Sequence, residues 1–243
     1  MTRAFLCCVA LPLVLVGCGS DSSQDQPTDQ IVPSFDVDVD TYSGGSTYIS
    51  AILGEPDSFT DVELKGGDAL VVSSDTNPNI PLEYDSTLQI YSTQLNGVSN
   101  MKTVSFALNR TKGTSAPKSS VTVPDSTLLT APADHAQVSA ASGTVKLTWS
   151  NPDPNVVGMY FFAAPCDSAA VSTDPSGQTS SDNGSFDLPV SGIVGAAPTA
   201  AGQCIQVFVE RDVNGTFDPA WSTDDKRTFV GKKTDEFRFL LTP

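Results

Sequence analysis

Hydrophobic and polar residues alternate with a period of two along the first half of the chain, from about residue 34 onward. The clearest runs are Phe35–Asp40, Thr47–Leu53, Ala69–Ser73, Thr87–Ser92, Thr103–Leu108 and Ser119–Val123. This period places successive side chains on opposite faces of a strand, and turn-forming residues such as Gly66 and Gly67 separate the runs. No convincing amphipathic helix pattern interrupts the series. We therefore predict an antiparallel β-sandwich over residues 34–124.

The sequence pattern of a second block, residues 125–243, also predicts strands. Its Pro-rich entry leads to a strand ending in tryptophan (Val145–Trp149), an aromatic strand (Met159–Phe162) and a Leu188-Pro189 pair. This order resembles a fibronectin type III or related Ig-like domain, although the tyrosine which that family carries at the start of a later strand is missing. The resemblance implies a second antiparallel β-sandwich. The sequence thus predicts an all-β chain of two tandem Ig-like/fibronectin III-like sandwiches, joined end to end by a short linker with some hinge freedom.

The chain begins with a short apolar segment. Arg3 precedes the apolar run from Phe5 to Val16, which is typical of a secretory signal peptide and too short to span a bilayer as a helix. The run ends in Leu15-Val16-Gly17-Cys18, which resembles a bacterial lipobox. The resemblance implies that residues 1–17 are removed and that Cys18 carries acyl chains such as palmitate, anchoring the protein to a membrane.

The residues that follow Cys18 predict the tether and the membrane. Residues 18–33 are polar and acidic, so we expect a flexible spacer with too little apolar surface to fold. In Gram-negative lipoproteins the residue after the lipidated cysteine influences sorting. Gly19 at that position, by resemblance, implies the outer membrane. Whether the protein faces the cell surface or the periplasm stays open.

The net charge of the chain limits which binding partners can be expected. Asp and Glu number 28 against 13 Lys and Arg, for a net charge of −15. So acidic a chain is not expected to bind nucleic acid or anionic lipid by electrostatics. We expect the membrane as a partner through the lipid on Cys18, and an unknown envelope protein or polysaccharide as the second partner.

Two further cysteines remain once Cys18 carries lipid and the signal peptide is removed. In an exported protein, Cys166 and Cys204 are expected to form a disulfide. The sandwich topology supports this pairing, because the strand ending at Ala164 would pair antiparallel with the strand beginning at Gln203. That arrangement can bring the two Cα atoms within the roughly 7 Å that a disulfide needs.

Catalytic signatures are missing from the sequence. His135 is the only histidine and lies in a turn-like stretch, and no serine-hydrolase, zinc-protease, phosphate-loop or dinucleotide motif is present. We therefore predict a non-catalytic binding or structural protein without a cofactor. A polysaccharide-acting hydrolase or its accessory binding module is the alternative, since the many aspartates supply no specific signal for or against carboxylate pairs.

The segment from Arg211 to Trp221 carries the remaining candidate chemistry. Asp212, Asn214 and Asp218 can aim oxygens at one calcium ion, which would suit calcium-dependent adhesion, but Gly215 comes too early for an EF-hand loop. The simpler prediction is a hairpin turning at Asn214-Gly215, with a return strand at Thr216-Phe217. Trp221 is a candidate exposed aromatic for ligand stacking, whereas Trp149 matches a core position. The aspartates at 36, 38 and 40 share one strand face, which we expect to be solvated.

Overall fold

The computed structural model describes residues 21–41, 46–56, 60–96, 103–167, 174–193, 197–224 and 227–243. In this part of the chain the fold is all-β, as predicted, with two short 3-10 turns, η1 (Thr28–Gln30) and η2 (Val190–Gly192). None of the described residues forms a helix long and apolar enough to cross a membrane. The lipidation candidate Cys18 and the whole signal segment lie outside the described residues.

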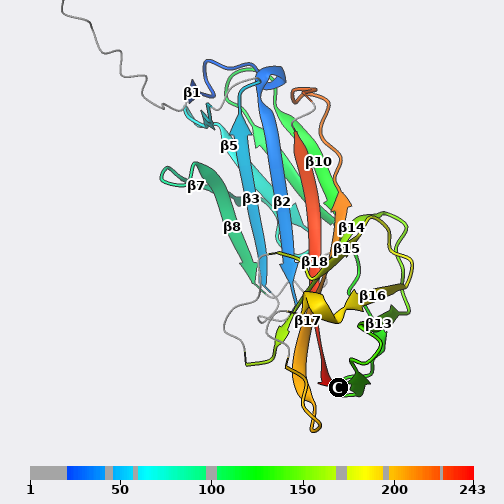
Figure 1. Ribbon diagram of the computed structural model, residues 1–243. Helices are drawn as coiled ribbons and strands as arrows, with labels where there is room; N and C mark the ends of the chain where they lie inside the picture. The colour runs from blue at the N-terminus through cyan, green and yellow to red at the C-terminus, as the bar shows by residue number, and fades with distance from the viewer. Residues whose placement is uncertain are drawn as a thin grey trace, which may run out of the picture.

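One large sheet runs the length of the molecule (Figure 1). Its strands, in spatial order, are β15 (Gly177–Thr179), β14 (Val156–Pro165), β17 (Gln203–Asn214), β18 (Thr228–Thr242), β2 (Val32–Asp40), β3 (Ser46–Gly54), β8 (Ile90–Asn96) and β7 (Glu83–Asp85). A ninth strand, β12 (Gln137–Ser139), pairs with the end of β18. Neighbours are antiparallel, except that β2 and β12 each run parallel to β18.

Two smaller sheets complete two sandwiches. The first contains β10 (Ala116–Thr122), β9 (Thr103–Asn109), β5 (Ala69–Ser74) and β6 (Ile80–Pro81). The second contains β11 (Leu129–Ala131), β13 (Thr144–Trp149) and β16 (Ser185–Pro189). In sandwich 1 the rings of Phe35 and Phe106 stack across the core at 4.4 Å, and in sandwich 2 Phe161 and Phe186 stack at 4.2 Å.

Both cores lie on the same face of the large sheet. Alternate residues of β18 point inward along its whole length: Phe229 packs in sandwich 1, whereas Phe239 and Leu241 are buried in sandwich 2. Between them, two successive inward positions of β18 are polar, and Lys233 and Asp235 there are both buried. The two sandwiches therefore share one continuous sheet, and buried polar side chains lie among the apolar ones on its inner face where the sandwiches meet.

This shared sheet corrects the predicted domain boundary. Residues 215–234 were expected in the second domain, but Trp221 and Phe217 pack against Phe35 in the core of sandwich 1. The predicted return strand at Thr216-Phe217 is also wrong, since β17 pairs with β18 and Thr216 instead bridges to Ser120. Alternation identifies a strand but not its partner, so the sequence did not show that the C-terminal aromatic residues fill the first core.

The linker between the two blocks is fixed rather than hinged. Arg211 of β17, fully buried, donates a hydrogen bond to the carbonyl of Asp125 (3.1 Å), and Asp235 accepts one from the main-chain N–H of Thr127 (2.6 Å). These bonds give the buried main chain its partners. Together with the unbroken strands β17 and β18, they contradict the expected hinge freedom.

The predicted spacer is ordered from Asp21 onward. β1 (Asp21–Ser22) pairs in parallel with β4 (Val62–Glu63), and Ser23, Thr28 and Ile31 are buried. The expectation of flexibility over residues 18–33 is thus wrong for residues 21–33. Composition did not reveal that polar groups elsewhere in the chain bind this segment.

The partner of this segment is a buried ion pair. The guanidinium of Arg110 lies 3.1 Å from the carboxylate of Asp68, and both side chains are almost completely buried. Arg110 also donates hydrogen bonds to the carbonyls of Ser23 and Gln26 and to the hydroxyl of Thr28. We call this set of contacts the Arg110 clamp. It adds charge-assisted hydrogen bonds to a segment that has little apolar surface to bury.

Candidate functional site

The outer face of the shared sheet carries a group of carboxylates around one lysine, where the two sandwiches meet. The register places Lys232 of β18 opposite Asp212 of β17 on one side and opposite Asp38 of β2 on the other. The ammonium of Lys232 pairs with Asp36 at 3.0 Å. Glu210 lies on the same face of β17, two residues before Asp212. We call Asp36, Asp38, Glu210, Asp212 and Lys232 the acidic cluster.

The acidic cluster holds more negative charge than its lysine can neutralise. Burial raises the pKa of Glu210 to about 7; the neighbouring Asp212 adds to the rise and Lys232 opposes it. Burial likewise raises the pKa of Asp212 to about 6 against the effect of Lys232, and raises the pKa of Asp38. One carboxylate oxygen of Asp38 and one of Asp212 are buried without a hydrogen-bond partner among the described residues. Carboxyl groups here take up protons near neutral pH because their charged forms are poorly solvated.

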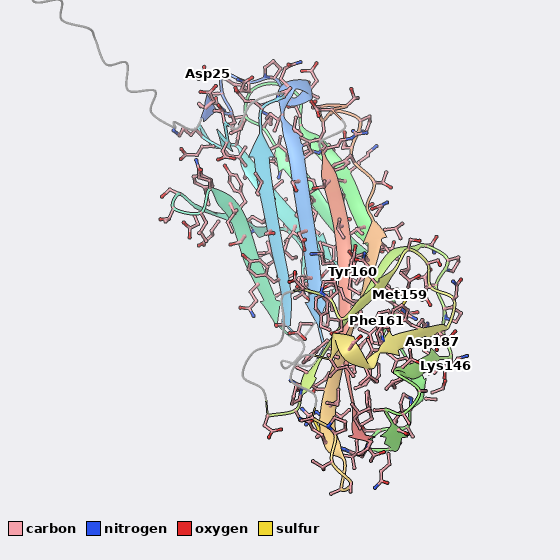
Figure 2. The ribbon with its side chains drawn as sticks, in the orientation of Figure 1. Asp25, Lys146, Met159, Tyr160, Phe161 and Asp187 are labelled. Atoms are coloured by element: carbon pink, nitrogen blue, oxygen red, sulfur yellow. A yellow bond between two sulfur atoms is a disulfide. The ribbon has the colours of Figure 1, made fainter. Side chains whose placement is uncertain are left out.

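An open hollow adjoins the acidic cluster along β14 and β15. It has a volume of about 490 Å³ and is lined by Val157, Gly158, Tyr160, Gln178, Thr179 and Ser180. The register places Tyr160 beside Glu210 and Gly158 beside Asp212, so the hollow and the cluster are continuous across neighbouring strands. Figure 2 labels Tyr160 on β14, at the level where the two sandwiches meet.

Glycine at position 158 shapes this hollow. A Cβ atom there would lie 3.1 Å from the ring of Tyr160 and 3.2 Å from its hydroxyl oxygen. The ring of Tyr160 therefore lies back over Gly158, at a spacing that leaves little room for a side chain. This position makes the ring a wall of the hollow.

The chemistry of the hollow suits a hydroxyl-rich ligand. Tyr160 offers an aromatic surface with a polar tip, while Gln178, Thr179 and Ser180 offer hydrogen-bond donors and acceptors. Glu210 adds a carboxyl group that can accept a hydrogen bond or, when protonated, donate one. The single histidine is not part of this arrangement: His135 is exposed and lies 3.5 Å from Asp134.

The predicted calcium set is not assembled. Asp212 faces Lys232 on the outer sheet surface, and Asn214 is exposed at the end of β17. Asp218 is buried in sandwich 1, where its two oxygens accept hydrogen bonds from the main-chain N–H groups of Lys118 and Ala220 (2.8 and 2.9 Å). Within the described part of the chain, no three His, Cys, Asp or Glu side chains are grouped to hold a metal ion. Asp212 and Asn214 share the outer face of β17, whereas Asp218 lies in the core of sandwich 1, so the three side chains do not meet around one ion.

The predicted stacking role of Trp221 is wrong. Trp221 is 1% exposed, and its indole N–H donates a hydrogen bond to the hydroxyl of Ser119 at 3.0 Å. The polar residues next to Trp221 suggested an exposed segment. In the structure, neighbours such as Asp218 instead accept hydrogen bonds from main-chain N–H groups. Trp149 is in the core of sandwich 2 as predicted, at 5% exposure.

The disulfide prediction is confirmed. Cys166 and Cys204 are bonded, with Cα atoms 5.5 Å apart. The reason is the one expected from the topology: β14 and β17 run antiparallel, and Pro165 lies opposite Ile205 at the end of the pair.

Sequence reasoning missed Tyr160, Glu210 and Lys232 as neighbours. Each occupies a polar or aromatic position in an alternating strand, so each could be assigned to an outer face. What the sequence lacked was the order of strands, in particular the insertion of β18 between β17 and β2. That order brings Asp36 and Asp38 next to residues far along the chain.

Comparison with known proteins adds no family. No protein-family model matches the chain, and no curated protein matches it. One matching solved structure is described as "Cytokine receptor complex - Crystal form 1A", with 11% identity, coverage of 78% of this chain and 90% of that chain, and a TM-score of 0.27. At that TM-score the likeness carries no argument, so the fold and the site rest on the strands and contacts described above.

Proposed function

We propose that the protein is a lipid-anchored component of a bacterial envelope with a non-catalytic binding role. The observation that carries this proposal is the N-terminal sequence, in which Arg3 and an apolar run lead into Leu15-Val16-Gly17-Cys18. The residues from Asp21 onward belong to the β fold, so a folded domain follows the candidate anchor closely in the sequence. By the resemblance of Gly19 to the sorting position of Gram-negative lipoproteins, the membrane is the outer membrane.

Acylation at Cys18 is tested in cells of the source organism or a Gram-negative host. The full chain is expected to incorporate an alkyne analogue of palmitate and to float with membranes in a density gradient. The Cys18→Ala variant is expected to lose both the label and flotation, whereas a Cys7→Ala variant, altered within the removed segment, keeps both. A labelled Cys18→Ala variant would overturn the anchor.

The hollow beside the acidic cluster is the proposed binding site, and a polysaccharide is the proposed ligand class. A tyrosine wall next to an amide, two hydroxyls and a carboxyl group matches the stacking and hydrogen bonding that a sugar offers. Calorimetry with envelope polysaccharides, including lipopolysaccharide core fragments, measures the binding. The Tyr160→Ala variant is expected to weaken affinity about tenfold, since it removes one aromatic ring from the wall of the hollow.

Tyr48 provides the matched control. It lies on β3, on the same outer face of the sheet, and is 47% exposed. The Tyr48→Ala variant is expected to bind as the unchanged protein does. Equal losses in both variants would place binding on the sheet face in general, and no heat with any polysaccharide would favour an envelope protein as the partner.

A polysaccharide hydrolase is the second candidate, favoured by the pKa of Glu210. A carboxyl group with a pKa of about 7 beside an open hollow can serve as a general acid. Its neighbour Asp212 lies two positions along the same strand and on the same face, with the two Cα atoms about 6.6 Å apart by strand geometry, so the site also offers the second carboxyl group that glycoside hydrolases use.

The two candidates are separated by turnover. If the protein is a hydrolase, reducing ends accumulate during incubation with the bound polysaccharide, and Glu210→Gln abolishes this release while Glu236→Gln, farther along β18, does not. If it is a binding protein, no reducing ends accumulate with either variant.

A further inference from the structure

The Arg110 clamp fixes the segment from Ser23 to Thr28 to one end of sandwich 1. The two guanidinium nitrogens of Arg110 beyond Nε bind the carbonyls of Ser23 and Gln26, the latter at 2.8 Å. The Arg110 side chain is 2% exposed. A bond network this deeply buried holds against thermal fraying, which exposed chain ends otherwise show.

Main-chain bonds extend this attachment back to Asp21. The N–H of Asp21 donates to the carbonyl of Asp61 at 2.8 Å, and the N–H of Ser23 donates to the carbonyl of Glu63 at 2.9 Å. The hydroxyl of Ser23 also binds the carboxylate of Asp68 at 3.0 Å. The chain is therefore fixed to the body from Asp21 onward.

The distance between anchor and body then follows from covalent geometry. Only Gly19 and Ser20 separate Cys18 from Asp21. Consecutive Cα atoms are 3.8 Å apart, so Asp21 lies at most about 11 Å from the Cα atom of Cys18. A tether this short cannot lift the end of sandwich 1 clear of the lipid headgroups.

We propose that the clamped end of sandwich 1 is held against the lipid headgroup surface and that sandwich 2 is the membrane-distal end. The inference rests on the proposed lipid anchor at Cys18 and specifies which surface the anchor presents to the bilayer. That surface includes the exposed residues Asp25 and Lys112. Figure 2 shows Asp25 at the opposite end of the molecule from Lys146 and Asp187 of sandwich 2.

The strands give the height of the distal end. β2 begins near the clamp and β18 runs parallel to it, from Thr228 opposite Ser34 to Thr242 at the far end. Fourteen steps of strand span about 45 Å. Cys204 pairs with Leu240 near that far end, so the disulfide is also distal. The hollow, at the junction, stands between the two ends.

Net charge favours an upright rather than a flat orientation. The chain carries a net charge of −15, and the outer sheet face bears the acidic cluster. Anionic headgroups repel such a face, so it gains nothing by lying on the membrane. The short tether, rather than surface attraction, holds the clamped end in place.

Collisional quenching from the headgroup layer measures this orientation. The acylated full chain is reconstituted in vesicles of phosphatidylethanolamine and phosphatidylglycerol containing a headgroup-quencher lipid. A dye is placed on Lys112→Cys at the clamped end or on Ser142→Cys, in the exposed turn between β12 and β13. The native cysteines do not react, because Cys166 and Cys204 are bonded and Cys18 carries the lipid. Since about 45 Å of strand separates the two ends, we expect at least about fivefold stronger quenching at position 112.

A lengthened tether separates this inference from the anchor itself. Twenty Gly and Ser residues inserted between Ser20 and Asp21 have an average reach of about 25 Å, and should bring the quenching at position 112 to within about twofold of that at position 142. Flotation of the vesicles reports the anchor independently. Protein that does not float refutes the anchor and this inference with it. Protein that floats with equal quenching at both positions, or with quenching unchanged by the insertion, overturns the inference alone.

Discussion

Among the described residues, each sandwich contains a buried arginine–aspartate pair, and the two arginines bind different parts of the molecule. In sandwich 1, Arg110 lies 3.1 Å from Asp68, and in sandwich 2, Arg211 lies 2.9 Å from Asp182, with the side chains buried in both. Arg110 binds the main chain of a peripheral segment. Arg211 lies on β17, a central strand of the shared sheet, and binds the linker between the sandwiches.

The surroundings of the two aspartates differ accordingly. Asp68 accepts hydrogen bonds from Ser23 and Thr111, so it keeps several partners if Arg110 is replaced. Asp182 accepts hydrogen bonds from the indole of Trp149 (2.5 Å) and the N–H of Asp153 (2.9 Å), which ties it to the core of sandwich 2. The Arg110–Asp68 pair thus holds one end of sandwich 1. The Arg211–Asp182 pair holds the junction between the two sandwiches.

The largest effect is expected from Asp182→Ala. This change leaves the Arg211 charge buried without its counter-ion and the indole of Trp149 without an acceptor. Breaking a buried pair in this way costs about 3–5 kcal/mol, so the midpoint of urea unfolding should fall steeply. Tryptophan fluorescence and circular dichroism measure it.

Asp187 supplies the control for this prediction. It lies on β16 and is exposed, so Asp187→Ala should change the free energy of unfolding by less than about 0.5 kcal/mol. A loss below about 1 kcal/mol for Asp182→Ala would contradict the role given to the Arg211 pair.

A smaller and more local effect is expected from Arg110→Met. The variant keeps the apolar stem of the side chain but removes the clamp, at a cost of about 2–3 kcal/mol. Because the hydrogen bonds of the clamp hold the peripheral segment, residues 21–31 should become cleavable by protease while the remaining sandwich stays folded. Mass spectrometry of limited digests locates the cuts. Arg238→Met, at an exposed site, should leave the digest unchanged, and cuts elsewhere in the chain would show that the clamp supports the whole fold.

The buried pair of sandwich 1 and the acidic cluster differ in how pH changes their contribution to stability. Burial raises the pKa of Asp68, but hydrogen bonds from Thr111 and Ser23 and the charge of Arg110 lower it further, to a net value below the ordinary one. Its contribution to stability is present above pH 3.8 and is lost as the pH falls through the lowered pKa. In the acidic cluster the pKa values are raised, so the effect of pH on stability is the opposite one: stability is lost as the pH rises.

We expect the free energy of unfolding to decrease as the pH rises from about 4.5 to 7. The pKa of Glu210 is 4.5 when unperturbed and about 7 in the folded chain, so the native state holds the proton more tightly across this window. After allowance for solvent screening, the loss is about 1–2 kcal/mol. Lys232 remains charged throughout, since the charge of Asp36 raises its pKa against the effect of burial.

Urea unfolding at pH 4.5, 5.5, 6.5 and 7.5 tests this pH dependence. The Glu210→Gln variant should flatten the profile by removing the ionisation, and Glu83→Gln at the β7 edge should leave it as it is. A profile that rises over this window in the unchanged protein would contradict the destabilising role of the cluster.

The strands themselves were predictable from the sequence, because alternation is a local property. Five of the six strand runs predicted in the first block match observed strands closely, and the sixth, at Thr87–Ser92, is shifted to Ile90–Asn96 because the residues before Ile90 form a turn. The disulfide was predictable too, since only two cysteines remained and the topology brought them together. Short strands such as β1 and β4 carried too few residues to show a period.

The pairing of strands that are far apart in the sequence could not be predicted. Nothing in the run from Thr228 onward shows that its first half pairs with β2, or that Trp221 fills a core formed by residues before 124. The acidic cluster depends on that pairing, so it could not be found from the sequence. The spacer was misjudged for a related reason: its composition is that of a disordered segment, and its order comes from contacts with residues far along the chain, among them Arg110, 87 residues away from Ser23.

The smallest effect is expected where an arginine–carboxylate pair is exposed. Arg238 and Glu236 form an ion pair of 2.8 Å on β18, but the arginine side chain is 48% exposed. Water and salt screen such a pair, so Arg238→Gln should cost less than about 1 kcal/mol, and the loss should shrink further at high ionic strength. Unfolding curves at low and high sodium chloride measure this loss beside that of Asp182→Ala. Similar losses in the two variants would mean that burial does not set the contribution of these pairs, and the contrast between the sandwich pairs would then need another cause.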